Sequence, residues 1–173
     1  MMRPLNFVPL FAVALLTACA TSGGSSPTAG ASLAATRGNT VAGTVSFVES
    51  DGEVRVTAEI TGLSPGPHGF HVHEKGDCSA PDGTSAGGHF NPGGKVHGHP
   101  GHGEHHAGDL PQLVADASGV ARLSASTKAL SVSPGETSVV GRSVIVHAGP
   151  DDFKSQPAGN SGPRVACGVI AAR

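Results

Sequence analysis

The chain has 173 residues, of which 14% are charged and 38% are hydrophobic. This composition excludes a disordered polyelectrolyte and an integral membrane protein, and the length suits one domain with short attachments. The formal net charge is −2 and the basic residues are scattered, which excludes nucleic acid as a partner. Histidine is the outlier: the chain has ten, nine of them between His68 and His106. We therefore expect a metal site.

The first residues have the plan of a secretory signal. Arg3 precedes an apolar run over 7–16, which small residues follow. The run is about ten residues long, too short for the roughly 20 that a helix needs to span a bilayer. Residues 16–19 (LTAC) resemble a bacterial lipobox, so we expect residues 1–18 to be a signal peptide of lipoprotein type and Cys19 to carry the lipid. The alternative is a simple signal followed by a chance cysteine.

The lipobox predicts a location in the cell envelope. Because Ala20 rather than Asp follows Cys19, we expect attachment to the outer membrane, facing the periplasm. Residues 19–37 hold almost no large apolar side chains and are expected to form the lipidated cysteine and a flexible tether. The folded domain is then expected over 38–173.

The cysteine count predicts a disulfide. With Cys19 lipidated, Cys78 and Cys167 remain as an even pair in an oxidising compartment. Two buried free thiols are the alternative. The bond would tie the last strand to the loop that holds Cys78.

Short strands are expected throughout the domain, because 26 Gly and 13 Pro interrupt a chain that is only 3% aromatic. A hairpin is predicted over 41–49 and 54–60, around Ser50-Asp51-Gly52. Further strands are predicted at 69–73, 112–115, 121–125, 143–147 and 165–171. This spacing suggests an antiparallel sandwich or barrel. The segments 74–110 and 148–164 lack a strand pattern, and loops of such length are usually functional.

Histidines gather on these strands and loops. His71 and His73, at i and i+2 of one predicted strand, project from the same face and can reach one ion. His89, His97, His106 and Asp109 follow on the first long segment, and His147 closes the strand 143–147. Six histidines and one aspartate are more than a single tetrahedral ion can use.

Several segments, in order, resemble the bacterial branch of the Cu,Zn superoxide dismutase family, in its lipoprotein form. They are GFHVHEKGDCS (69–79), GGHFNP (87–92), His97 with HHAGDL (105–110), GRSVIVHAGPDD (141–152) and GNSGPRVACGV (159–169). The resemblance covers about 40–173. It implies an all-β fold, a Greek-key antiparallel β-barrel or sandwich of about eight strands with two long functional loops. It also implies an enzyme, an oxidoreductase that dismutates superoxide to dioxygen and hydrogen peroxide.

The resemblance implies one copper and one zinc ion per chain. The copper ligands fall on His71, His73, His89 and His147, and the zinc ligands on His89, His97, His106 and Asp109. His89 would bridge the ions and take part in catalysis. An all-imidazole set suits Cu(II), and three imidazoles with a carboxylate suit a structural Zn²⁺.

Two further residues match the family pattern. Asp151 would hydrogen-bond His71 and His97 from behind the ligands, and otherwise would be a loop-capping residue. Arg164 would guide the superoxide anion as the second catalytic residue.

The rival function is a non-enzymic periplasmic copper/zinc-binding protein of the same fold. A homodimer is left open, because bacterial members differ in whether they dimerise.

Four histidines lie outside this assignment. His99, His102 and His105 crowd the first long segment, either as solvated loop residues or as a metal-capture surface. His105 could also compete with His106 as a ligand, although the three-residue step to Asp109 favours His106. His68 is expected to face solvent after Pro67.

Overall fold

The computed structural model of the chain describes Met1 and residues 26–173. The predicted signal peptide, Cys19 and the first part of the predicted tether lie outside the described residues. Within the described part, no helix has both the length and the apolar character that crossing a membrane requires.

Ten strands and one 3₁₀ turn make up the secondary structure of the described part. They are β1 (Thr28–Ala35), β2 (Ala42–Ser50), β3 (Glu53–Thr61), β4 (Gly66–His68), β5 (Phe70–His73), η1 (Thr84–Ala86), β6 (Leu113–Ala115), β7 (Ala121–Thr127), β8 (Ser143–His147), β9 (Arg164–Val169) and β10 (Ala171–Ala172). The predicted all-β class is confirmed. The number of strands exceeds the predicted eight for two reasons. A short strand, β4, precedes the predicted strand 69–73, and neither β1 nor the two-residue β10 was expected.

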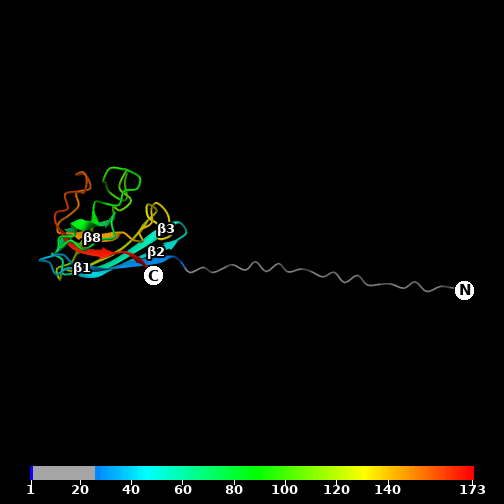
Figure 1. The fold of residues 1–173 in the computed structure, drawn as a ribbon, viewed down its shortest axis with the longest axis horizontal. Coiled ribbons are helices and arrows are strands. Elements are labelled where there is room, and N and C mark those ends of the chain that lie inside the picture. Colours follow the sequence, from blue (N-terminus) through cyan, green and yellow to red (C-terminus); the bar gives the residue numbers. More distant parts are fainter. Residues whose placement is uncertain (2–25) are drawn as a thin grey trace.

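The strands form one antiparallel sheet that curls into a nearly closed barrel (Figure 1). Hydrogen-bonded neighbours follow the order β4-β6-β7-β3-β2-β1-β9-β8-β5, and β10 pairs with β1. The end strands of this order, β4 and β5, are separated in the chain only by Gly69. Gly69 donates its N–H to Gly149 O at 2.8 Å and accepts from His147 N at 2.9 Å. The two edges of the sheet are thus held close together.

Aliphatic side chains fill the barrel because the strands alternate between core and solvent. β3 buries Val54, Val56, Ala58 and Ile60 and exposes most of the residues between them. The predicted hairpin is present as β2 and β3, paired from Ala42↔Thr61 to Ser50↔Glu53. Its turn places Asp51 and Gly52 at φ 54° and 73°, the left-handed conformation that tight hairpin turns need.

The prediction that residues 19–37 form a flexible tether is wrong for 28–35, which form β1. This strand pairs with β2 from Thr28 to Leu33, and with β9 at Ala34 and Ala35. Apart from Leu33, its inward side chains are small, so the segment has little hydrophobicity of its own. Pairing with partners far away in the chain stabilises it instead. The domain therefore begins about ten residues before Gly38.

Two of the long connections of the barrel match the predicted functional loops. One runs from the end of β5 to the start of β6, and the other from the end of β8 to the start of β9. Both rise from the barrel on the same side, in green and orange in Figure 1. A disulfide between Cys78 and Cys167 joins the first loop to β9, as the cysteine count predicted.

Candidate metal centre

The edge of β5 gathers the metal-ligating residues. His71 and His73 belong to β5, and isolated bridges pair His71 with Asp109 and His73 with His89. The bridges are fixed by hydrogen bonds to Val72, which donates to Gly108 O at 2.9 Å and accepts from Phe90 N at 2.8 Å. The first long loop thus adds its ligands to the strand through backbone pairing.

Four imidazoles form what we call the first set: His71, His73, His89 and His147. Their ligand atoms all lie within 4.8 Å of one another, and all four residues are buried. One nitrogen of each ring is buried without a hydrogen-bond partner: His71 Nδ1, His73 Nε2, His89 Nε2 and His147 Nε2. Buried nitrogens without partners are costly, and a bound metal ion would satisfy them.

The other nitrogen of each ring in the first set is held by an acceptor. His71 Nε2 lies 2.6 Å from Asp151 Oδ2, His73 Nδ1 lies 3.0 Å from Gly87 O, and His147 Nδ1 lies 3.0 Å from Gly162 O. A ring nitrogen next to an oxygen acceptor carries the proton, which leaves the lone pair on the opposite nitrogen. These contacts therefore point three lone pairs inward, as metal ligation requires.

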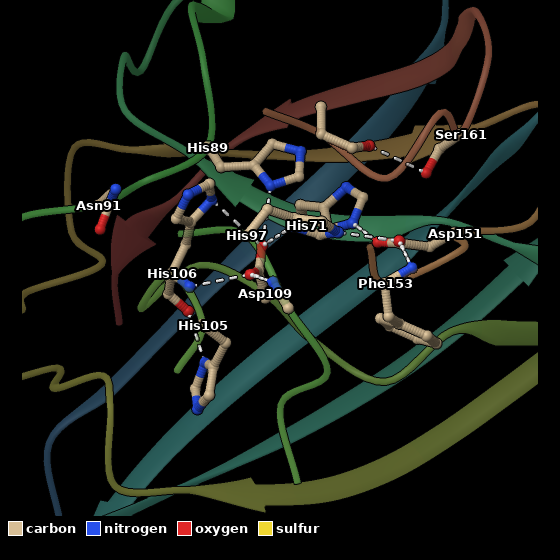
Figure 2. Close-up of polar contacts among 12 residues, drawn as sticks. His71, His89, Asn91, His97, His105, His106, Asp109, Asp151, Phe153 and Ser161 are labelled. Carbon is tan, nitrogen blue, oxygen red and sulfur yellow. Dashed lines mark hydrogen bonds and ion pairs between the residues drawn. The ribbon is translucent and has the colours of Figure 1, made fainter. Parts of the chain in front are cut away.

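The second set consists of His89, His97, His106 and Asp109. Asp109 Oδ1 lies 2.8 Å from His89 Nδ1, 3.0 Å from His97 Nδ1 and 3.5 Å from His106 Nδ1. Asp109 Oδ2 accepts from the amides of His106 and Gly98, which fixes the carboxylate (Figure 2). Three imidazoles and one carboxylate make a closed four-ligand set, typical of structural zinc.

His89 belongs to both sets, with Nε2 in the first and Nδ1 in the second. The structure also decides between the two adjacent histidines of the loop. His106 joins the second set, whereas His105 directs Nδ1 to His106 O at 2.8 Å and turns its ring away from the set (Figure 2). All seven predicted ligand residues are thus brought together.

Asp151 connects the two sets as the sequence predicted. Its Oδ2 binds His71 Nε2 at 2.6 Å, and its Oδ1 binds His97 Nε2 at 2.9 Å. Burial raises the pKa of this carboxyl, but hydrogen bonds from His71, the Phe153 amide and His97 outweigh burial and lower the pKa to about 2. Asp151 is therefore a permanent carboxylate that orients one imidazole of each set.

Burial keeps the imidazoles of the first set neutral. It lowers the pKa of His71 to about 3, against the opposing hydrogen bond to Asp151, and that of His147 to about 4. Burial also lowers the pKa of His73 and His89. Neutral rings have a free lone pair, so these residues can bind a metal ion without first losing a proton.

Arg164 lies beside the first set, as predicted. Its Nη1 donates to Gly83 O at 2.7 Å and its Nη2 donates to Gly87 O at 2.6 Å. Gly87 O also accepts from His73 Nδ1, so one carbonyl holds both the guanidinium and a ring of the first set. Burial lowers the pKa of Arg164, and nearby Asp82 opposes that effect. A cavity of about 340 Å³ is lined by Arg164 together with Arg37 and Asp82.

The prediction that His68 faces solvent is wrong. His68 is 2% exposed, with Nδ1 2.8 Å from His147 O and Nε2 2.8 Å from Ser64 O. Both contacts are to backbone carbonyls, one of them the carbonyl of a first-set residue. His68 therefore ties β4 to the end of β8.

Two glutamines that no sequence motif predicts also support the site. Gln156 accepts from His97 N and donates to His97 O, both at 2.9 Å. Gln112 accepts from the amide of Asp151 at 2.9 Å. Glutamine in a loop gives no motif, and only the fold shows what these side chains meet.

Known proteins resemble this chain along most of its length. Residues 41–170 match the family described as copper/zinc superoxide dismutase. A superoxide dismutase [Cu-Zn] of Deinococcus radiodurans is 43% identical, and the match covers 99% of each chain. Superoxide dismutase [Cu-Zn] 3 of Arabidopsis thaliana is 46% identical over 76% of this chain and 84% of its own.

A solved structure agrees with these sequence matches. The crystal structure of the clock protein EA4 superposes with a TM-score of 0.76 at 42% identity, and covers 86% of this chain and 97% of its own. The family match spans more than half of the chain, the named relatives are superoxide dismutases, and the two buried ligand sets suit copper and zinc. The chain therefore belongs to the copper/zinc superoxide dismutase family, as an oxidoreductase that uses both metals.

Proposed function

We propose that this chain converts two superoxide anions and two protons into one dioxygen and one hydrogen peroxide, with copper in the first set and zinc in the second. The observation that carries this proposal is the pair of buried ligand sets joined at His89. Bound copper would supply the one-electron couple that oxidises the first superoxide and reduces the second, and zinc would fix the loop.

Arg164 is the residue that would attract and position the anion. The chain has a net charge of −2, so attraction must come from local positive charge and not from the whole surface. Arg164 is held beside the first set by two carbonyls, and Arg37 adds a second cation to the wall of the same cavity. Asp82 in that wall reduces the local positive charge without cancelling it.

His89 is the residue placed to move a proton. Its Nδ1 lies 2.8 Å from Asp109 Oδ1, while its Nε2 faces the first set without a hydrogen-bond partner. A proton held at Nε2 can pass to the peroxide as it forms, and water supplies the second proton. The ring keeps its position throughout because Asp109 and the second set retain Nδ1.

Arg164 also distinguishes the enzyme from a non-enzymic metal-binding protein of the same fold. Metal storage does not need a half-buried cation next to the ligands, because positive charge there opposes the binding of a cation. Both guanidinium contacts hold the charge at that position. This placement favours catalysis on an anion.

The test is to measure copper and zinc per chain together with superoxide consumption on the full chain. We expect activity that rises with copper content and disappears when a chelator removes copper. Full loading of both metals without activity above that of free copper would contradict the proposal.

We also propose that the enzyme works in the cell envelope, attached through a lipid at Cys19. The support is the lipobox-like segment LTAC and the apolar run before it. Changing Cys19 to Ser should abolish labelling by a radioactive fatty acid and release the protein from membranes. A serine variant that still labels and sediments with membranes would show that the anchor lies elsewhere.

A further inference from the structure

Two histidines outside both ligand sets lie next to each other on the loop between His97 and His106. The ring centroids of His99 and His102 are 4.8 Å apart, and both side chains are exposed. Nothing in the dismutation chemistry described above uses them. Exposed imidazoles can ligate a metal ion, because one nitrogen of each neutral ring offers a lone pair.

A tight turn places the two rings on the same side of the loop. His102 donates its amide to His99 O at 3.0 Å, which closes a turn over His99-Pro-Gly-His102. Pro100 occupies the second turn position, where its ring fixes φ in advance. The pairing of His99 with His102 is thus built into the backbone and does not depend on chance contact between flexible side chains.

The ligand sets of this structure provide a measure of the spacing that two imidazoles need. In the second set the centroids of His89, His97 and His106 are 5.2, 5.4 and 5.5 Å apart. Metal–nitrogen bonds of about 2.0–2.1 Å at angles of about 90–110° place two ring centroids about 4.5–5.2 Å apart. The 4.8 Å separation of His99 from His102 lies within this range, whereas two of the three spacings in the metal-free second set are slightly longer than it.

The pair is also connected to the second set. Gly98, next to His99, donates its amide to Asp109 Oδ2 at 3.2 Å. A cavity of about 160 Å³ has both His99 and Asp109 in its wall, which is larger than the roughly 10–15 Å³ that a cavity needs to hold one water. The ring of His99 lies 4.6 Å from that of Phe153, centroid to centroid and tilted by 59°, and the Phe153 amide donates to Asp151 Oδ1. An ion held at His99 would therefore lie beside the residues that complete the zinc site.

We propose that His99 and His102 form a capture site for Zn²⁺ that passes the ion to the second set. This inference rests on the proposed function only in taking the second set as the zinc site. Two imidazoles leave the remaining coordination positions of the ion to water. Such an open site exchanges its metal readily, whereas the closed second set retains it.

A hydrogen bond at His99 keeps the capture site weak. The amide of Gly101 donates to His99 Nδ1 at 3.0 Å, so in the metal-free protein the lone pair of Nδ1 is engaged and Nε2 carries the ring proton. Binding a metal at either ring nitrogen breaks this hydrogen bond, because a proton moved to Nδ1 would face the N–H of Gly101. The bound ion is therefore released easily, as transfer to a tighter site requires.

His105 provides a matched control. It belongs to the same loop and is the same residue type, but its ring is half-buried and its Nδ1 donates to His106 O, so it would offer at most one isolated ligand nitrogen. The structure does not pair it with His99 or His102. The sequence alone could not separate these three histidines.

The first experiment measures binding directly. The full chain, loaded with copper and zinc, is dialysed to equilibrium against Ni²⁺, and all three metals are counted by mass spectrometry. We expect His99→Gln/His102→Gln to bind Ni²⁺ about tenfold more weakly or worse than the parent, because loss of a direct ligand should cost at least as much as loss of a supporting contact. His105→Gln should bind like the parent, and unchanged copper and zinc contents show that the variants are folded.

The second experiment measures transfer. Metal-free full chain receives limiting Zn²⁺ in competition with a chromogenic chelator, and the rate and final extent of zinc uptake are recorded. We expect slower uptake by the double variant, at the same final zinc content. Ni²⁺ binding that is unchanged in the double variant, or equally weakened in His105→Gln, overturns the capture site, and equal uptake rates overturn transfer. Both readouts count metal, so a failure of dismutation would not be mistaken for either result.

Discussion

Replacing Asp151 with Asn tests whether one carboxylate holds both ligand sets in place. The carboxylate accepts from His71 Nε2 at 2.6 Å and from His97 Nε2 at 2.9 Å. An amide of the same size has one acceptor oxygen and an NH₂ group that can only donate. One of the two imidazole N–H groups would therefore face another donor, and that ring would lose its orientation.

The size of the effect follows from burial. Both rings and the carboxylate are almost completely buried, so water cannot replace the missing acceptor. A buried donor without a partner costs about 1–3 kcal/mol, which corresponds to about 5- to 150-fold in an equilibrium constant. We expect the dissociation constant for zinc to rise by a factor in this range, because His97 belongs to the second set.

The assay is competition for zinc between the full chain and a chelator, with copper content measured in parallel. Asp152→Asn is the control, since it removes the same charge at the next residue. The Asp152 carboxylate is exposed and bonds only to Lys154 and Ser155 in its own loop. Unchanged zinc affinity in Asp151→Asn, or an equal loss in Asp152→Asn, would refute this account of Asp151.

Arg164→Ala should lower the rate of superoxide consumption by about tenfold or more at low salt and weaken its dependence on ionic strength, with metal content unchanged. Arg164→Lys should recover part of the rate, and an alanine variant as fast as the parent at low salt would remove Arg164 from the mechanism. A double variant with Ser in place of both Cys78 and Cys167 should have a free energy of unfolding in urea lower by about 4–5 kcal/mol, because the disulfide joins residues 89 apart in sequence. A loss below about 1 kcal/mol would contradict this estimate of the effect of the cross-link. Hydrogen bonds from the Ser133 and Val132 amides lower the pKa of Glu49. The ionised carboxylate therefore stabilises the fold fully above the ordinary pKa of 4.5, and this stabilisation is lost as pH falls through the lowered pKa. Glu49→Gln should therefore cost less than about 1 kcal/mol at neutral pH, with the difference from the parent shrinking in acid, and a constant difference across that pH range would rule out the carboxylate as the cause.

Motifs predicted the ligands well because each ligand lies in a short segment of distinctive sequence. His71 and His73 share one strand, and Asp109 follows His106 by three residues. Alternation between apolar and polar residues also predicted β2 and β3 nearly to their ends. In these cases the information that determines the structure is local.

Features that depend on distant partners were missed for the same physical reason. The small residues of β1 show no strand pattern, and pairing with both β2 and β9 stabilises the segment. His68 is buried because carbonyls of Ser64 and His147 meet its two nitrogens. A fragment that starts at Gly38 would lack β1, so experiments on a shortened protein should retain it.

With the proposed lipid at Cys19, the early start of β1 would also limit the distance between the barrel and the membrane. Nine residue steps separate Cys19 from Thr28, and a fully extended chain of that length reaches no more than about 32 Å. A lipid at Cys19, as proposed above, would confine the barrel to a layer about one small domain deep beside the bilayer. The start of β1 and the two long loops lie at well-separated places on the barrel (Figure 1). The short attachment would therefore leave the metal centre accessible to superoxide that arises at the membrane surface.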